Sequence, residues 1–217
     1  MRLVVFDVDG TLVDSQADIV ASMAAAFAAV GQDAPSRTEI LSIVGLSLPL
    51  AMQALAPDAD HDRMVETYKD SYARLRMTKG VESSPLYPGA RDALDRLNGR
   101  DDRLLGVATG KSKRGLDGLI DAHALDGYFV TRQVADFHPS KPHPAMLQAA
   151  LDEAGVGPDH AVMVGDTSFD AQMAQAAGVP FIGVNWGYHP AHLLDGAETV
   201  LGDFSELDAA LIDLWGE

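Results

Sequence analysis

The chain has 217 residues, 47% of them hydrophobic and 22% charged, a composition typical of a soluble globular protein that can bury a sizeable core. Its formal net charge of -16 makes nucleic acids and anionic membranes poor partners, whereas a small anionic substrate stays open because one bound cation reverses the local potential. The sequence contains no cysteine, which excludes disulfides, thiolate catalysis and Cys-based zinc sites.

The first predicted element is a buried parallel strand at residues 2–7, because this run is apolar throughout and does not alternate. Asp7 interrupts the run too early for the core of a signal peptide. No stretch approaches the ~20 apolar residues of a membrane-spanning helix. We therefore expect a cytoplasmic protein.

Residues 15–85 are predicted to form a helical subdomain inserted after this strand, because helical patterns follow one another there without any strand pattern. In one of them, Ser36 and Glu39 have the spacing of a capping box. The predicted helices cover residues 15–31, 36–45, 49–56 and 61–77. Residues 1–14 and 86–217 are expected to form the second unit, an α/β core.

In the second unit, strand and helix patterns alternate, which favours a doubly wound parallel sheet with helices on both faces. Strands are predicted at residues 103–109, 127–131, 161–166 and 180–185. Helices are predicted at residues 88–100, 143–155 and 168–178, with a closing amphipathic helix at 204–217. Ser168 is the predicted N-cap of the helix at 168–178.

Polar side chains stand where these strands end, and ligands of an open parallel sheet bind beyond the carboxyl ends of its strands. The first strand is followed by Asp7, Asp9 and Thr11, the strand at 103–109 by Thr109 and Gly110, and the strand at 161–166 by Asp166 and, one turn later, Asp170. Lys141 lies in the loop ahead of the helix at 143–155. Each alone has an ordinary explanation as a turn, a helix cap or a solvated charge. Together they place four carboxylates beside one lysine, and such carboxylates raise one another's pKa unless a cation intervenes. Because Mg²⁺ prefers carboxylate and phosphate oxygens, the sequence predicts a magnesium site and an anionic substrate.

These residue types also suit phosphoryl transfer. An aspartate beside a metal can attack phosphorus, and a carboxylate two residues further on can protonate the leaving oxygen. The metal and the lysine would stabilise charge on the transferring group, and Thr109 would hold a phosphate oxygen.

The segments DVDGT, ATG, SKPHP and GDTSFD occur in this order and resemble the four motifs of the haloacid dehalogenase superfamily, most closely its phosphoglycolate-phosphatase-like branch. The resemblance extends from residue 4 to about residue 185. It implies that Asp7 is the nucleophile and Asp9 the general acid and base, and that Thr109 and Lys141 bind the phosphate. The dehalogenases of the superfamily lack an aspartate at the position of Asp9, so its presence here indicates phosphoryl transfer.

The same resemblance implies a Mg²⁺ ion held by Asp7, by the backbone carbonyl of Asp9 and by Asp166. It places Asp170 nearby, either as a further ligand or just behind the ligands.

The resemblance further implies that residues 15–85 are a mobile cap over the active site. Gly45 and Leu46, in the segment VGLSLPL, stand where the family contacts its substrate, although an ordinary turn between helices is an open alternative. A carboxylate-bearing substrate such as phosphoglycolate would need a cation from the cap. The sequence does not select one among the candidates Arg37, Arg63, Lys69, Arg74, Arg76 and Lys79.

One further motif is discounted. The segment GVATGKS has three residues between Gly106 and Gly110, whereas a nucleotide-binding P-loop needs four.

The sequence thus predicts a phosphatase for a small phosphate monoester, acting as a monomer or a homodimer. A phosphosugar mutase and an inorganic pyrophosphatase are alternatives within the superfamily. A non-catalytic binding protein is the alternative outside it.

Overall fold

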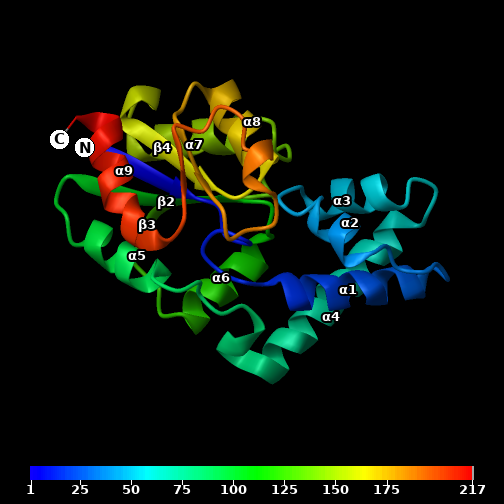
Figure 1. Cartoon of the computed structure of the whole chain (residues 1–217). Helices are drawn as coiled ribbons and strands as arrows, with labels where there is room; N and C mark the ends of the chain where they lie inside the picture. Colours follow the sequence, from blue (N-terminus) through cyan, green and yellow to red (C-terminus); the bar gives the residue numbers. More distant parts are fainter. Residues whose placement is uncertain (217) are drawn as a thin grey trace.

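The computed structural model describes residues 1–216, and within them the strands form one parallel sheet in the order β3-β2-β1-β4-β5-β6 (Figure 1). The strand bounds are β1 Arg2–Phe6, β2 Arg103–Thr109, β3 Phe129–Val134, β4 Ala161–Gly165, β5 Phe181–Val184 and β6 Thr199–Leu201. From β1 the chain builds the sheet first towards β3 and then, from β4, in the opposite direction. The switch point therefore lies between β1 and β4, and the predicted doubly wound α/β fold is confirmed.

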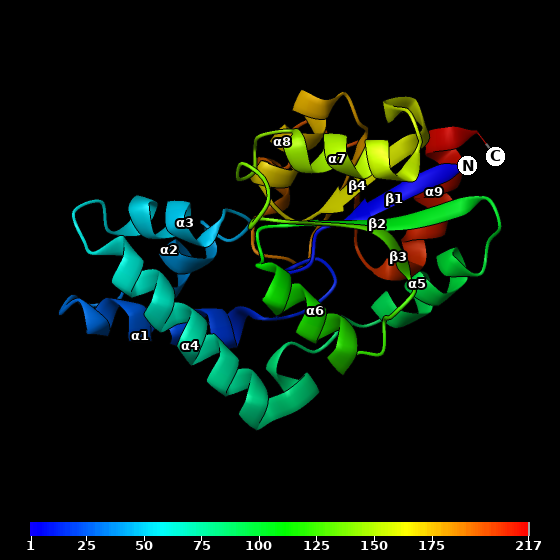
Figure 2. The ribbon, with the colours of Figure 1, turned by 180° about the vertical axis from the view of Figure 1, so that it is seen from behind.

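Helices cover both faces of this sheet, as Figures 1 and 2 show. One face packs against α5 (Ala90–Asn98), α6 (Lys113–Ala122) and α9 (Leu207–Trp215), and the other against α7 (Ala145–Ala154) and α8 (Ser168–Ala177). Side chains of β1 alternate between the two layers: Val4 and Phe6 belong to the first, Leu3 and Val5 to the second. Burial on both faces explains why this strand is apolar throughout.

The helical patterns predicted between residues 15 and 85 are present as a group of helices beyond the carboxyl ends of the strands (Figure 2). Their bounds are α1 Gln16–Ala29, α2 Arg37–Leu41, α3 Leu48–Leu55 and α4 His61–Lys79. They enclose a hydrophobic cluster of their own, which includes Met23, Phe27, Met52 and Met64. The predicted capping box of Ser36 and Glu39 is present at the start of α2.

Short 3-10 helices complete the described chain: η1 Gly80–Ser83, η2 Pro158–His160, η3 Ala191–Leu193 and η4 Phe204–Glu206. The last of these precedes α9, and the two together form the predicted closing helix, except that Glu217 lies outside the described residues. None of the helices in the described part of the chain is both long and apolar enough to span a bilayer.

Several local features differ from the sequence-based expectations. The strand expected at 127–131 lies at Phe129–Val134, and the helix expected at 36–45 ends at Leu41. Helix α6 was not predicted, because Gly115 and Gly118 weaken its helical signal. Strand β6 is only three residues long, too short for its pattern to be recognised. The N-cap of α8 is Thr167 and not Ser168, because the Thr167 hydroxyl and the Asp170 carboxylate form a reciprocal capping box.

The packing of α5 on the sheet generates a stability prediction. Leu94 is fully buried in this layer, so Leu94→Ala is expected to lower the free energy of unfolding by about 2–5 kcal/mol. The matched control is Leu193→Ala, at a side chain that is 43% exposed, with an expected change within about 0.5 kcal/mol. Urea unfolding followed by circular dichroism measures both, and equal losses would contradict this account of the core.

Candidate active site

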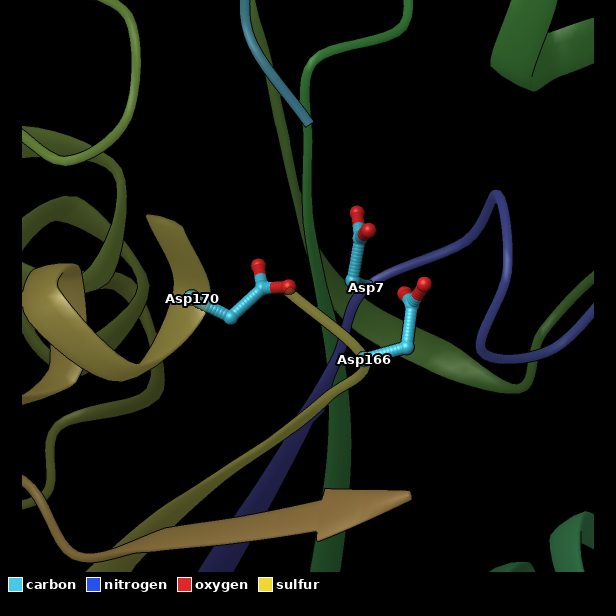
Figure 3. A group of neighbouring side chains, drawn as sticks. All are labelled: Asp7, Asp166 and Asp170. Carbon is cyan, nitrogen blue, oxygen red and sulfur yellow. The ribbon is translucent and has the colours of Figure 1, made fainter. Parts of the chain in front are cut away.

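Strands β1 and β4 place two carboxylates side by side at the switch point of the sheet. Asp7 follows β1, and its backbone N–H continues the ladder by donating to the Val164 carbonyl at 2.9 Å. Asp166 follows β4, and Asp170 lies in the first turn of α8. Figure 3 shows the three carboxyl groups turned towards one another, and one oxygen of each lies within 4.8 Å of the others. All three residues are buried.

Lys141 lies among these carboxylates and is itself fully buried. Its Nζ is 2.8 Å from Oδ1 of Asp7 and 2.6 Å from Oδ1 of Asp170. Burial alone would lower the pKa of Lys141, but the charges of Asp170 and Asp7 outweigh it and hold the pKa above its usual value. The side chain is therefore a fixed ammonium that neutralises one of the three carboxylates.

The single charge of Lys141 does not compensate the other carboxylates of the cluster. Burial, together with the negative charges of Asp170 and Asp9, raises the pKa of Asp7 to about 7 although Lys141 opposes the shift. Burial and the charges of Asp170 and Asp7 likewise raise the pKa of Asp166 well above its usual value. Both shifts show that the pocket favours an added cation.

The donor atoms suit a hard divalent cation, because all are carboxylate oxygens on a rigid frame. Thr11 Oγ1 donates to Oδ1 of Asp166 at 2.8 Å, and the backbone N–H of Tyr188 donates to Oδ2 at 2.8 Å. Gly10 has φ +88°, and a Cβ at this position would collide with the Asp166 carboxylate. The backbone after Asp9 can therefore approach the carboxylates only with glycine here.

The side chain of Asp9 lies outside the cluster formed by Asp7, Asp166 and Asp170, and it has different partners. Its Oδ1 accepts a hydrogen bond from the Ser15 hydroxyl at 2.5 Å and from Nζ of Lys111 at 2.8 Å. Nζ of Lys111 also lies 3.3 Å from the Tyr72 hydroxyl and 4.8 Å from the centre of its ring. Tyr72 belongs to α4, so this ion pair contacts both the sheet edge and the helical segment. Only the backbone carbonyl of Asp9 was expected to bind metal, so its side-chain position leaves that expectation unchanged.

The end of β2 meets the loop between α2 and α3. Thr109 is buried there, and its Oγ1 accepts a hydrogen bond from the Lys111 backbone N–H at 3.2 Å. A Cβ on Gly110 would lie 2.7 Å from the carbonyl oxygens of both Gly45 and Leu46, so this loop is seated directly on the strand end. The structure thus brings the predicted substrate-contacting residues of both segments together, and they line the same cavity as Asp7 and Asp9.

Several residues of the site were not singled out from the sequence. Lys111 belongs to the segment GVATGKS, which was considered only as a possible P-loop. Its position directly after Thr109 and Gly110, at the end of a strand, was the signal that could have identified it. Ser15 lies close to Asp9 in sequence but carried no distinguishing pattern. Tyr188 contributes its backbone N–H from the loop after β5, a contact that only the fold creates.

Comparison with known proteins gives consistent matches. Residues 4–184 match the model of the haloacid dehalogenase-like hydrolases. The chain is 35% identical to "Probable phosphatase IndB" of Dickeya dadantii, over 96% of this chain and 92% of that protein. It is 33% identical to a phosphoglycolate phosphatase of Pseudomonas putida, over 89% of this chain and 73% of that protein. A solved hydrolase structure from Pseudomonas syringae superposes with a TM-score of 0.86 at 24% identity, covering 98% of this chain and 99% of that one, which shows the shared fold.

The buried position of Lys141 generates a pH-dependent prediction. Lys141→Met leaves Asp7 and Asp170 without their shared ammonium, and the free energy of unfolding is expected to fall by about 3–5 kcal/mol at pH 8. The loss should be smaller at pH 5, because protonation of Asp7, whose folded pKa is already raised, relieves the unpaired charge.

The measurement is urea unfolding in the presence of EDTA at both pH values. Lys113→Met is the matched control, because Lys113 is 57% exposed and pairs only with Asp117 at the surface. An equal loss for Lys141→Met at both pH values would contradict the electrostatic account.

Asp166 generates a second prediction, of opposite sign. Its folded pKa is raised, so the charged form costs stability once the pH exceeds the unfolded pKa, and this cost is complete above the folded pKa. Asp166→Asn removes the charge and keeps both contacts, because the amide oxygen can accept from the Tyr188 N–H while Thr11 accepts from the amide nitrogen. In EDTA at pH 8 the variant should melt at a higher temperature than the wild type, and the gap should close towards pH 4.

Added Mg²⁺ should reverse that order, because the wild type gains stability from a bound ion and the variant gains less. A thermal melt at each pH, with and without Mg²⁺, measures both effects. A variant that is less stable than the wild type in EDTA at pH 8 would show that the carboxylate charge is already compensated.

Proposed function

This chain belongs to the haloacid dehalogenase-like hydrolase family and is a phosphatase of its phosphoglycolate-phosphatase-like branch, and we propose that it hydrolyses a small organic phosphate monoester with Mg²⁺ through a phosphorylated Asp7. One observation supports the mechanism: two aspartates close in sequence lie in different environments. Asp7 contacts Lys141 within a buried cluster of three carboxylates, whereas Asp9 has Ser15 and Lys111 as partners. Two neighbouring aspartates in different environments suit two different roles.

In the first step, a carboxylate oxygen of Asp7 forms a bond to phosphorus while the bond from phosphorus to the leaving oxygen breaks. The acid form of Asp9, which the second step regenerates, donates a proton to that oxygen, and the alcohol departs. Lys141 fixes the Asp7 carboxylate through its contact with Oδ1. Thr109 and the adjoining backbone of Gly110 are the proposed hydrogen-bond donors to the phosphoryl oxygens.

In the second step, Asp9 accepts a proton from water, whose oxygen attacks phosphorus as the bond to Asp7 breaks. Inorganic phosphate leaves, and both aspartates return to their starting states. Asp7, Asp166 and the backbone carbonyl of Asp9 would hold Mg²⁺, with Asp170 as ligand or support. When bound there, the ion neutralises charge on the transferring phosphoryl group.

Residues 15–85 are proposed to act as the cap, on a core formed by residues 1–14 and 86–217. The two connections run side by side, because the Asp14 N–H donates to the Pro85 carbonyl at 2.9 Å and Val13 pairs with Leu86. Hinging at this double connection would move α1–α4 as a unit around their own hydrophobic cluster. Closure would exclude water from the phosphorylated aspartate and bring Gly45 and Leu46 to the substrate.

The substrate named for several relatives is phosphoglycolate, which makes it the first ester to test. The proposal also includes a cytoplasmic location, and it leaves monomer and homodimer open.

Turnover by aspartate variants tests the mechanism. Asp7→Asn should lower kcat by about 10⁴-fold or more, because no phosphorylated intermediate can form. Asp9→Asn should lower kcat by about 10²–10⁴-fold with a smaller change in KM, because general acid–base catalysis is lost while the nucleophile remains. Phosphate release from a panel of esters, with Mg²⁺ and with EDTA, measures both.

The exposed Asp117→Asn serves as the control and should retain wild-type turnover. Folded protein that becomes phosphorylated but releases no phosphate would favour the mutase alternative. Wild-type turnover by Asp7→Asn would refute the mechanism.

A further inference from the structure

A cavity of about 670 Å³ lies between the carboxyl ends of the strands and helices α1, α3 and α4. Asp7, Asp9 and Thr109 line it from the sheet side. Figure 2 shows these helices beyond the carboxyl ends of the strands, with α4 passing beside α6. The cavity continues directly from the proposed catalytic centre, so its size and lining bear on the leaving group of the substrate.

The volume of the cavity does not result from a separation of the helical segment from the core. The carbonyl oxygens of Gly45 and Leu46 already press on Gly110, and the Ser47 N–H donates to the Ser140 hydroxyl of the core at 2.7 Å. Nε2 of His189, also in the core, lies 3.0 Å from the Ser42 carbonyl oxygen. The loop between α2 and α3 is thus seated on the sheet edge while the cavity remains.

Phosphoglycolate would leave most of this space empty. A water molecule takes up about 30 Å³, so a glycolate group needs the room of a few waters, roughly 100 Å³. The phosphoryl group, a cation and its waters need roughly 200 Å³ on the same basis. The remaining volume is that of a much larger leaving group, and pockets of roughly 300–1,000 Å³ typically enclose drug-sized ligands.

Much of the cap side of the cavity is apolar and aromatic, next to Lys69 and Arg76 of α4. We call the apolar part the apolar wall and define it by Met23, Ile43, Leu46, Leu48, Tyr68 and Met77. Tyr68 stacks on Tyr72, with ring centres 6.0 Å apart and an angle of 15° between the rings. A stacked pair presents a rigid aromatic surface, and thioethers beside it make favourable contacts with rings.

The cavity lining also carries the cations Lys69, Arg76, Lys111 and Arg114, but none of them belongs to the apolar wall. The lysine nearest the proposed acid–base residue, Lys111, is already paired with Asp9 at 2.8 Å. Arg76, from α4, donates to the Gly115 carbonyl oxygen at 3.3 Å. A glycolate carboxylate packed on Tyr68 and Met23 would lose hydration to side chains that carry no charge, a cost that an uncharged ring would avoid.

We propose that the substrate is the phosphate monoester of a bulky, ring-bearing alcohol, with the ring packed on the apolar wall. This assignment rests on the phosphatase function proposed above and specifies its leaving group. The phosphate end would meet Asp7 and Thr109, and the ring would extend from the leaving oxygen towards Tyr68 and Met23. Glycolate, which has no ring, would gain nothing from the wall.

The test is kcat/KM for esters that share a primary-alcohol leaving oxygen and differ in bulk. Pyridoxal 5′-phosphate, riboflavin 5′-phosphate and uridine 5′-monophosphate provide rings, and phosphoglycolate and glycerol 3-phosphate do not. At least one ring-bearing ester should exceed both small esters by about tenfold or more, the scale on which an apolar pocket discriminates. The inference is overturned if phosphoglycolate or glycerol 3-phosphate equals or exceeds all of the ring-bearing esters.

A cavity-filling variant locates the effect. Ala73 lines the cavity from α4, so Ala73→Trp occupies part of the space without removing a larger side chain. The ratio of kcat/KM for the best ring-bearing ester to that for phosphoglycolate should fall by about tenfold. Ala28→Trp is the matched control on the exposed face of α1, outside the lining, and should keep the wild-type ratio. Equal ratios in both variants would show that the ring does not occupy this cavity.

The outcomes for the two proposals are distinct. Phosphate release from phosphoglycolate alone, abolished by Asp7→Asn, would uphold the phosphatase function and refute the ring-bearing substrate. Release from none of the esters by folded, Mg²⁺-loaded protein would refute the phosphatase function itself. Because the substrate panel uses the wild-type protein, it decides the matter even if a tryptophan variant fails to fold.

Discussion

The packing of three buried carboxylates around a single buried ammonium is the constraint on which the rest of this molecule depends. The Lys141 ammonium lies 2.8 Å from Asp7 and 2.6 Å from Asp170 and supplies one positive charge. The excess negative charge that remains, together with burial, raises the pKa values of Asp7 and Asp166. A folded protein tolerates such an imbalance only where function uses it, because each unpaired buried charge reduces an already small stability. The same imbalance favours a divalent cation at this site, and with it the proposed phosphate substrate.

The parallel sheet makes this arrangement possible. Its strand order reverses between β1 and β4, so two strand ends deliver Asp7 and Asp166 to one point without helices between them. Their frame is completed from distant parts of the chain, by Thr11 and by the Tyr188 backbone. Rigid strands covered on both faces hold the carboxylates where repulsion would otherwise separate them.

In the proposed mechanism the helical segment and the core have different roles. The core carries the chemistry, and the apolar wall of the helical segment would bind the leaving group. Asp9 is where the two meet: its partner Lys111 also contacts Tyr72 of α4. Two relatives named for phosphoglycolate are 33% and 32% identical to this chain, and such overall similarity does not fix the wall that faces the alcohol. In this chain that wall is apolar and the space before it is large, so the leaving group is the part of the substrate that family membership leaves undecided.

The sequence by itself determined the fold class, most of the elements and the residues that gather at the sheet edge, because apolar runs, helical periodicity and strand-end motifs are local signals. It missed α6, whose two glycines weaken its pattern, and β6, which is three residues long. It also left the cap side of the site open. Only the tertiary structure decided that Lys111 pairs with Asp9, that the Tyr188 backbone holds Asp166, and that the cavity is large and has an apolar wall. These features arise where segments far apart in the chain meet, and no pattern within one segment records the volume between two of them.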